Sequence, residues 1–223
     1  IVLVLMNGRP LSVGWAAENV DAILEAWYPG TAGGHALADV LFGDYNPSGK
    51  LPVTFPRAVG QVPIYYNAKN TGRPYSTGSA EQKYLSRYLE TPNTPLFPFG
   101  FGLSYTTFDY SPVKLSRSKI EPGQSLTASV TVRNAGKRAG VETVQFYLRD
   151  LVGSVTRPVK ELKGYQRITL KPGERKTVSF KIDESDLAFY RADMSYGAEP
   201  GEFAVFIGGS SESTKEAKFA LVE

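Results

Sequence analysis

The sequence predicts two regions of different fold class, an α/β sandwich remnant with parallel strands and helices followed by an all-β sandwich. Continuous apolar runs alternate with helix signals near the N-terminus, as in strands that are covered on both faces of a parallel sheet. From about residue 112, apolar and polar residues alternate with period two, which is typical of half-buried strands. We therefore divide the chain into an α/β region at 1–60, a connecting loop at 61–111 and a sandwich at 112–223.

The α/β region begins with residues 1–6, an uninterrupted apolar run that predicts a buried strand. Residues 21–27 predict a second buried strand, and residues 35–42 predict a helix that ends at Gly43. Two strands with one or two helices cannot cover both faces of a sheet. We therefore expect residues upstream of Ile1 to complete this region, and we expect residues 1–100 to be unstable without them.

The connecting loop at 61–111 is rich in tyrosine, proline, asparagine and glycine. Aromatic side chains at this density normally pack or bind, which argues against a flexible linker. The composition therefore predicts a long ordered loop.

The sandwich region contains a clear alternating strand, because Leu126, Ala128, Val130 and Val132 are apolar and the residues between them are polar. Similar patterns predict strands at 143–148, 159–170, 177–182, 202–207 and 217–222. Three Pro-Gly pairs predict turns, at Pro122-Gly123, Pro172-Gly173 and Pro200-Gly201. About seven short strands with turns between them predict an immunoglobulin-like sandwich.

The strand aromatics Phe146, Tyr165, Phe180 and Phe206 lie amid alternating apolar positions. We expect most of them in the core of the sandwich. An exposed row of aromatics on one face would instead favour a carbohydrate-binding or adhesive module.

Composition excludes several kinds of site. The 25 basic and 22 acidic residues are mixed along the chain, so the formal net charge of +3 predicts no nucleic-acid partner. No cysteine is present and only one histidine, which argues against disulfides, thiolate nucleophiles and transition-metal sites. Calcium or magnesium on oxygen ligands stays open. The apolar run at 1–6 is far too short to span a membrane.

Three isolated polar residues of the α/β region could suggest catalysis. Asp39 falls within the predicted helix, Asp44 follows its terminal glycine, and His35 lies in its first turn. Solvated or turn-capping roles explain these positions better than catalysis.

The strongest local candidate for sugar binding is the stretch at 70–88. Arg73, Tyr75, Arg87 and Tyr88 combine charged donors with flat apolar faces, a mixture suited to sugar hydroxyls and the C–H faces of pyranose rings. The alternative is that the arginines tie the stretch to the sandwich or to a second subunit. The sequence favours this structural interpretation.

Six motifs carry a resemblance to a known family. They lie at residues 26–30, 33–52, 70–75, 86–88, 95–106 and 157–165, and include Pro47-Ser48-Gly49-Lys50-Leu51-Pro52, Phe97-Pro98-Phe99-Gly100-Phe101-Gly102 and Arg157-Pro158-Val159-Lys160-Glu161-Leu162. With these motifs the chain resembles family 3 glycoside hydrolases of the periplasmic β-glucosidase type over essentially its whole length. The resemblance implies that the sandwich is a fibronectin type III-like domain.

The resemblance also implies a function for the intact protein. In that family a (β/α)8 barrel carries an aspartate nucleophile and the α/β sandwich domain carries a glutamate acid/base, both before the segment that matches Ile1. The chain would then be the C-terminal part of a retaining exo-acting β-glucosidase that hydrolyses terminal β-D-glucosyl residues, without the nucleophile or the acid/base. We expect it to be inactive alone, because retention needs two carboxyl groups about 5 to 5.5 Å apart. Specificity for glucose or xylose stays open.

Partners and location follow from the same resemblance. It implies a β-linked oligosaccharide or aryl glucoside substrate, the N-terminal catalytic portion of the same enzyme as a partner, no organic cofactor, no membrane partner, and a periplasmic or secreted location. A homodimer is an open alternative. The rival functions are a carbohydrate-binding module and a structural bracing module.

Overall fold

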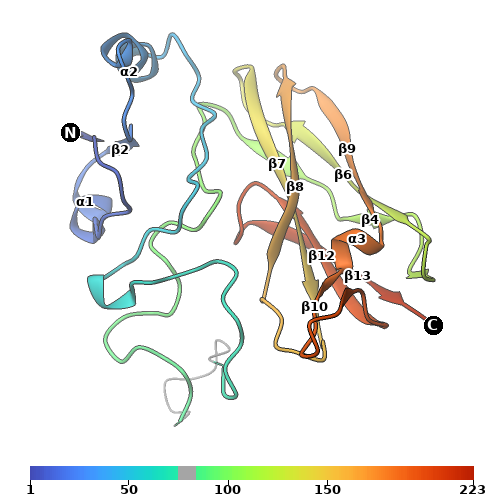
Figure 1. Cartoon of the computed structure of the whole chain (residues 1–223). Helices are drawn as coiled ribbons and strands as arrows, with labels where there is room; N and C mark the ends of the chain where they lie inside the picture. The colour runs from blue at the N-terminus through green and yellow to red at the C-terminus, as the bar shows by residue number, and fades with distance from the viewer. Residues whose placement is uncertain (75–83) are drawn as a thin grey trace.

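The computed structural model describes residues 1–74 and 84–223. Figure 1 shows an N-terminal part with α1, β2 and α2, a β-sandwich at the opposite side, and long connecting stretches between them. Two of these stretches run antiparallel, since Leu51 N donates to Phe101 O at 2.8 Å and Phe55 N donates to Phe97 O at 2.9 Å. No helix in the described part of the chain is both long and apolar enough to cross a membrane.

The N-terminal part contains a two-stranded parallel sheet. Its strands are β1 (Val2–Leu5) and β2 (Ala22–Glu25), joined by helix α1 (Gly14–Asn19) and followed by helix α2 (Gly33–Phe42). Both predicted strands and the predicted helix are present, and Gly43 ends α2 in the left-handed conformation with φ 87°. Helix α1 was not predicted from the sequence. A short 3-10 helix (Val59–Gln61) begins the connecting loop.

The expected burial of the first strand on both faces is not met within the described residues. Ile1, Val2 and Met6 are exposed, and Leu3 to Leu5 are only half-buried. Helices α1 and α2 therefore leave much of this sheet uncovered. The cause is geometric, because two strands and two short helices enclose little volume.

The sandwich consists of two sheets. A five-stranded sheet has the order β5-β13-β12-β7-β8, and a four-stranded sheet contains β3, β6 and β4 with β9 also paired to β6. The strands are β3 (Phe108–Tyr110), β4 (Lys114–Leu115), β5 (Lys119–Ile120), β6 (Leu126–Asn134), β7 (Gly140–Asp150), β8 (Glu161–Leu170), β9 (Arg175–Ile182), β12 (Gly201–Gly208) and β13 (Thr214–Leu221). Between β9 and β12 lie helix α3 (Glu184–Leu187) and the small hairpin β10 (Phe189–Tyr190) with β11 (Tyr196–Gly197).

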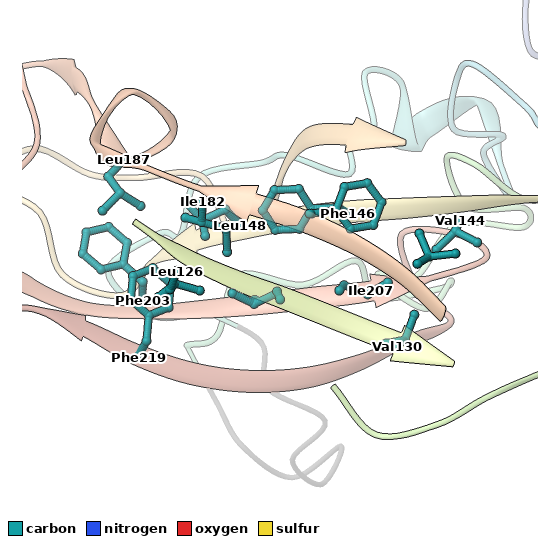
Figure 2. Packing of buried hydrophobic residues seen from close by; sticks show 14 of the residues in the cluster. Leu126, Val130, Val144, Phe146, Leu148, Ile182, Leu187, Phe203, Ile207 and Phe219 are labelled. Carbon is teal, nitrogen blue, oxygen red and sulfur yellow. The ribbon is translucent and has the colours of Figure 1, made fainter. Parts of the chain in front are cut away.

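One hydrophobic core joins the two sheets, as Figure 2 shows. The alternation predicted for β6 is confirmed, since Leu126, Ala128, Val130 and Val132 are all buried. Phe146 of β7 stacks on Phe180 of β9 with ring centroids 5.1 Å apart. These contacts fix the sheets face to face.

Two of the four strand aromatics lie outside this core, contrary to expectation. Tyr165 is 63% exposed and Phe206 is half-buried. Tyr165 pairs with Gln145, and Phe206 pairs with Tyr147. Because side chains alternate along a strand, these positions face away from the Phe146 side of the five-stranded sheet. The sequence placed them on the wrong face.

Two of the three predicted Pro-Gly turns are confirmed by glycine φ angles of 77° at Gly123 and 76° at Gly173. The third is wrong, because Gly201 is the first residue of β12.

Candidate functional site

The connecting loop packs on the outer face of strand β7. Tyr66 stacks on Phe99 with ring centroids 4.3 Å apart and meets Tyr147 edge-on at 5.8 Å. Tyr147 is fully buried although it points away from the sandwich core, and this burial raises the pKa of its hydroxyl. The surface that orders this part of the loop therefore belongs to the same chain.

Gln145 of β7 ties two other segments to this outer face. Its amide nitrogen donates to Gly100 O at 3.0 Å and to Gly209 O at 2.7 Å, and its amide oxygen accepts from Tyr147 Oη at 2.5 Å. Gly100 has φ 78°, and a Cβ there would lie 2.0 Å from Gln145 Oε1. Only glycine allows this approach of loop to strand.

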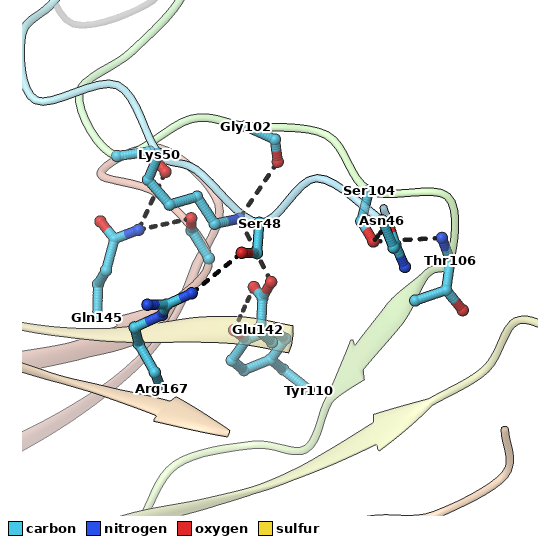
Figure 3. A network of polar contacts seen from close by, with 12 residues as sticks. Asn46, Ser48, Lys50, Gly102, Ser104, Thr106, Tyr110, Glu142, Gln145 and Arg167 are labelled. Carbon is cyan, nitrogen blue, oxygen red and sulfur yellow. Dashed lines mark hydrogen bonds and ion pairs between the residues drawn. The ribbon is translucent and has the colours of Figure 1, made fainter. Parts of the chain in front are cut away.

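A buried ion pair joins the residues 46–52 stretch to the rim of the sandwich, as Figure 3 shows. Lys50 Nζ lies 3.3 Å from Glu142 Oε2 and donates to Gly102 O at 3.2 Å. Glu142 also accepts from Tyr110 Oη at 2.8 Å, and the Lys50 and Glu142 side chains are only 15% and 6% exposed. Burial first, and then the neighbouring carboxylate of Glu142, raise the pKa of Tyr110.

Further hydrogen bonds extend this contact. Asn46 Oδ1 accepts from Ser104 Oγ at 2.9 Å and from Tyr105 N at 2.8 Å, while Arg167 Nη2 donates to Ser48 Oγ at 3.0 Å. We call Ser48, Lys50, Glu142, Gln145 and Arg167 the junction network. It holds residues 46–52 and 98–105 against the sandwich.

The stretch at 157–161 carries two cationic side chains that pack against aromatic rings of the sandwich domain. Lys160 Nζ donates to Ser211 O at 2.5 Å and lies 4.4 Å from the Phe206 ring centroid, and burial lowers its pKa. Arg157 Nη2 donates to Glu161 at 2.9 Å, and its guanidinium lies 4.2 Å from the Phe189 ring. Lys160 thereby fixes the turn between β12 and β13.

That turn forms one side of an open groove of about 820 Å³. The other sides come from the connecting loop at 64–68 and 87–99. The lining combines aromatic, proline and aliphatic residues with a few polar and charged side chains; it includes Tyr65, Tyr66, Arg87, Tyr88, Glu90, Pro92, Asn93, Phe99, Ser211 and Glu212. This combination is typical of a ligand site.

Two family models match the chain. The C-terminal domain of glycosyl hydrolase family 3 matches residues 1–105, and the fibronectin type III-like domain matches residues 142–211. The chain belongs to glycoside hydrolase family 3. It carries the C-terminal domain of that family and the fibronectin type III-like domain that follows it.

Relatives and solved structures agree with this membership. A periplasmic β-glucosidase of Salmonella typhimurium is 57% identical over 222 residues, which is 100% of this chain and 29% of the relative. A β-xylosidase of Formosa agariphila is 50% identical over 96% of this chain and 28% of its own length. The crystal structure of a Listeria innocua β-glucosidase with glucose superposes with a TM-score of 0.95, at 43% identity over 100% of this chain and 31% of that chain. The family 3 chain thus spans less than a third of these relatives.

Two of the four predicted sugar-binding residues lie in the same groove. Arg87 and Tyr88 line the groove. Arg73 is exposed and lies 5.9 Å from the Tyr84 ring rather than in the groove, and Tyr75 lies outside the described residues. Sequence reasoning missed Tyr65 and Glu212; the paired tyrosines at 65–66 were a signal for the first, and nothing local marked the second.

The other polar candidates lie apart from the groove. Asp39, Asp44 and His35 are all exposed. Across residues 1–74 and 84–223, no group of three histidine, aspartate or glutamate side chains could hold a metal ion.

Proposed function

We propose that this chain is the C-terminal part of a retaining exo-acting β-glucosidase that hydrolyses terminal β-D-glucosyl residues of β-linked oligosaccharides or aryl glucosides. The observation that carries the proposal is the 57% identity, over the whole chain, to a protein named periplasmic β-glucosidase. The 43% identical structure solved with glucose supports the same sugar. No organic cofactor is needed for this hydrolysis.

The catalytic carboxylates come, in this proposal, from other parts of the intact protein. Retention requires one carboxylate to attack the anomeric carbon and a second carboxyl group to protonate the leaving oxygen. The buried carboxylate of Glu142 is paired with Lys50 and accepts a hydrogen bond from Tyr110. Asp39 and Asp44 are exposed and do not line the groove. The 223-residue chain should therefore show no turnover by itself.

The role of this chain is to hold the connecting loop in place and to supply part of the sugar-binding wall. The junction network supports the first role, because it fixes residues 46–52, which precede the loop, and residues 98–105, at the end of the loop, on the sandwich. Arg87 and Tyr88 support the second, since both line the groove. Arg73 and Tyr75 remain proposed contacts to substrate or to a second subunit in a homodimer.

The test of the activity is a panel of aryl β-glycosides with the full-length enzyme. The glucoside should have the highest kcat/KM, and the product should form with retained anomeric configuration. A higher kcat/KM for the xyloside would replace glucose by xylose as the proposed sugar. This outcome is the specific alternative, because one relative at 50% identity is named a β-xylosidase. Inversion of configuration would overturn the proposed mechanism.

The loop residues are tested in the same enzyme. Arg73→Ala or Tyr75→Ala should raise KM or weaken assembly with little effect on kcat. Arg175→Ala, an exposed arginine of β9, is the matched control. Unchanged KM and unchanged assembly in both loop variants would remove these residues from the site.

The location proposed for the protein is periplasmic or secreted. The name of the 57% identical relative supports the periplasm. Fractionation of the native host should recover the full-length protein outside the cytoplasm, and recovery from the cytoplasm would contradict the proposal. Of the rival functions, structural bracing is favoured by the junction network and accompanies the proposed activity.

A further inference from the structure

We propose that the groove between the connecting loop and the β12–β13 turn binds a β-linked oligosaccharide of several sugar units. The ligand class rests on the proposed function, whereas the position of the site rests on the groove alone. Its volume of about 820 Å³ falls in the range of roughly 300 to 1,000 Å³ that is usual for small-ligand sites.

The aromatic walls suit pyranose rings. Tyr65 and Tyr88 line the groove and are 64% and 41% exposed, so a ligand can reach both rings. Exposed tyrosines present a flat apolar face and a polar tip, and sugars present the complementary C–H faces and hydroxyl groups. The Tyr65 and Tyr88 rings are therefore the proposed stacking contacts.

The polar rim suits a neutral ligand rich in hydroxyl groups. Glu90 and Glu212 supply carboxylate acceptors, and Arg87 supplies a cation on the same groove. Mixed charge disfavours a strongly charged ligand. Ser211 is buried beside Glu212, and its Oγ makes no hydrogen bond among the described residues, which leaves one polar group to be satisfied at the groove.

The groove is built from segments that the fold already holds rigid. Ser211 N donates to Phe99 O at 2.9 Å, and Lys160 Nζ donates to Ser211 O at 2.5 Å. On the opposite side, Asn93 Oδ1 accepts from Tyr88 N at 3.0 Å. Walls that are ordered before binding reduce the entropy lost when a ligand is held.

A proline-rich peptide is the rival occupant, because such peptides also bind aromatic-lined grooves. Proline has no backbone N–H, so a proline-rich segment offers few donors to Glu90 and Glu212. Every sugar unit carries several hydroxyl donors. The carboxylates on the rim therefore favour the oligosaccharide.

The test is isothermal titration calorimetry of the 223-residue chain with cellotetraose. Saturable binding is expected, and Tyr65→Ala and Tyr88→Ala should each raise the dissociation constant at least about tenfold, equivalent to about 1.4 kcal/mol. Glu212→Gln, a change at an exposed side chain that leaves packing intact, should raise it by a smaller factor. Tyr165→Ala is the matched control, since Tyr165 is an exposed tyrosine outside the groove, and it should bind like the parent chain.

Absence of cellotetraose binding by the chain, while the amide hydrogens of residues 64–68 and 87–99 are protected from exchange, would overturn the proposal. So would binding that Tyr65→Ala, Tyr88→Ala and Glu212→Gln all leave unchanged. Binding of decaproline in place of cellotetraose, lost in the tyrosine variants, would assign the groove to a peptide. Hydrolysis of aryl glucosides by the full-length enzyme is measured separately, so failure of the groove does not imply failure of the proposed activity.

Discussion

The sandwich and the N-terminal region bury their apolar side chains to very different extents. Among the described residues before Pro112, Ala16 and Phe55 are the buried hydrophobic residues, whereas the sandwich encloses one cluster drawn from both of its sheets. In the N-terminal region Ile1, Trp15 and Phe42 are exposed. The sandwich thus has a core of its own, and the N-terminal region does not form one within this chain.

The contact between the two regions combines the aromatic packing of Tyr66 on Tyr147 with buried polar contacts. Lys50, Glu142 and Gln145 hold the connecting stretches through an ion pair and backbone hydrogen bonds. Polar contacts of this kind specify one geometry, because a displaced partner leaves a buried group unsatisfied. The sandwich therefore acts as the platform on which the rest of the chain is positioned.

The largest expected effect contrasts one phenylalanine from each region. Phe203→Ala should lower the free energy of unfolding of the chain by about 3 to 5 kcal/mol, because Phe203 is 1% exposed in the sandwich core. Phe42→Ala should change it by less than about 0.5 kcal/mol, since Phe42 is 84% exposed on α2. Urea denaturation followed by tyrosine fluorescence measures both. Equal losses would show that the N-terminal region contributes a core of comparable strength.

The next effect falls on the junction itself. Glu142→Gln should leave the buried Lys50 ammonium without its counter-charge and cost about 1 to 3 kcal/mol. Amide hydrogen exchange should rise at 46–52 and 98–105, while β6 and β12 stay protected. Glu202→Gln on the exposed side of β12 is the control. Equal exchange in both variants would mean that apolar contacts alone hold the two regions together.

Local patterns were enough to predict much of the sandwich and the C-terminal end of α2. The strict alternation in β6 matches its buried positions, and a glycine after the last helical residue marked the end of α2. The two-residue strands β4, β5, β10 and β11 were not predicted, because they are too short to show a period.

The candidate site was predicted only in part, because its walls meet through the fold. Arg87 and Tyr88 line the same groove as Glu212, although more than a hundred residues separate them along the chain, and no spacing encodes that arrangement. Tyr147 was not marked by the sequence, yet it is buried on the opposite face of the sheet under Tyr66. The covering loop, rather than the strand pattern, decides its burial.

A smaller effect tests whether the sandwich region is stabilised locally as well as by its core. Asp183 caps α3, since its side chain accepts from Ser185 N at 3.2 Å while Asp186 accepts from Asp183 N at 3.1 Å. Asp183→Ala should cost about 1 kcal/mol in the free energy of unfolding. Asp109→Ala, at an exposed carboxylate of β3, is the matched control and should cost less. A loss no larger than that of the control would show that α3 is held by Leu187 in the core alone.

The smallest expected effect is a change of pH dependence at the opposite end of β7. Asp150 Oδ1 accepts from Val152 N at 3.2 Å, but Oδ2 has no hydrogen bond and lies 3.8 Å from Arg157 Nε. Burial raises the pKa of Asp150 despite the nearby guanidinium. A carboxyl group with a raised folded-state pKa binds its proton more tightly in the folded protein. Its contribution to stability is therefore greatest below the unfolded pKa, and declines as the pH rises toward and through the folded pKa.

Asp150→Asn removes this titration while keeping an oxygen for Val152 N. The variant should gain stability relative to the parent chain as the pH rises from about 3.8 toward neutral, because only the parent must ionise a buried group. Chemical denaturation at a series of pH values measures this difference in the free energy of unfolding. Asp183→Asn should show the opposite pH dependence, because hydrogen bonds from Ser185 lower the pKa of Asp183. A stability difference between Asp150→Asn and the parent that falls with rising pH would mean that Arg157 stabilises the Asp150 carboxylate more than burial penalises it.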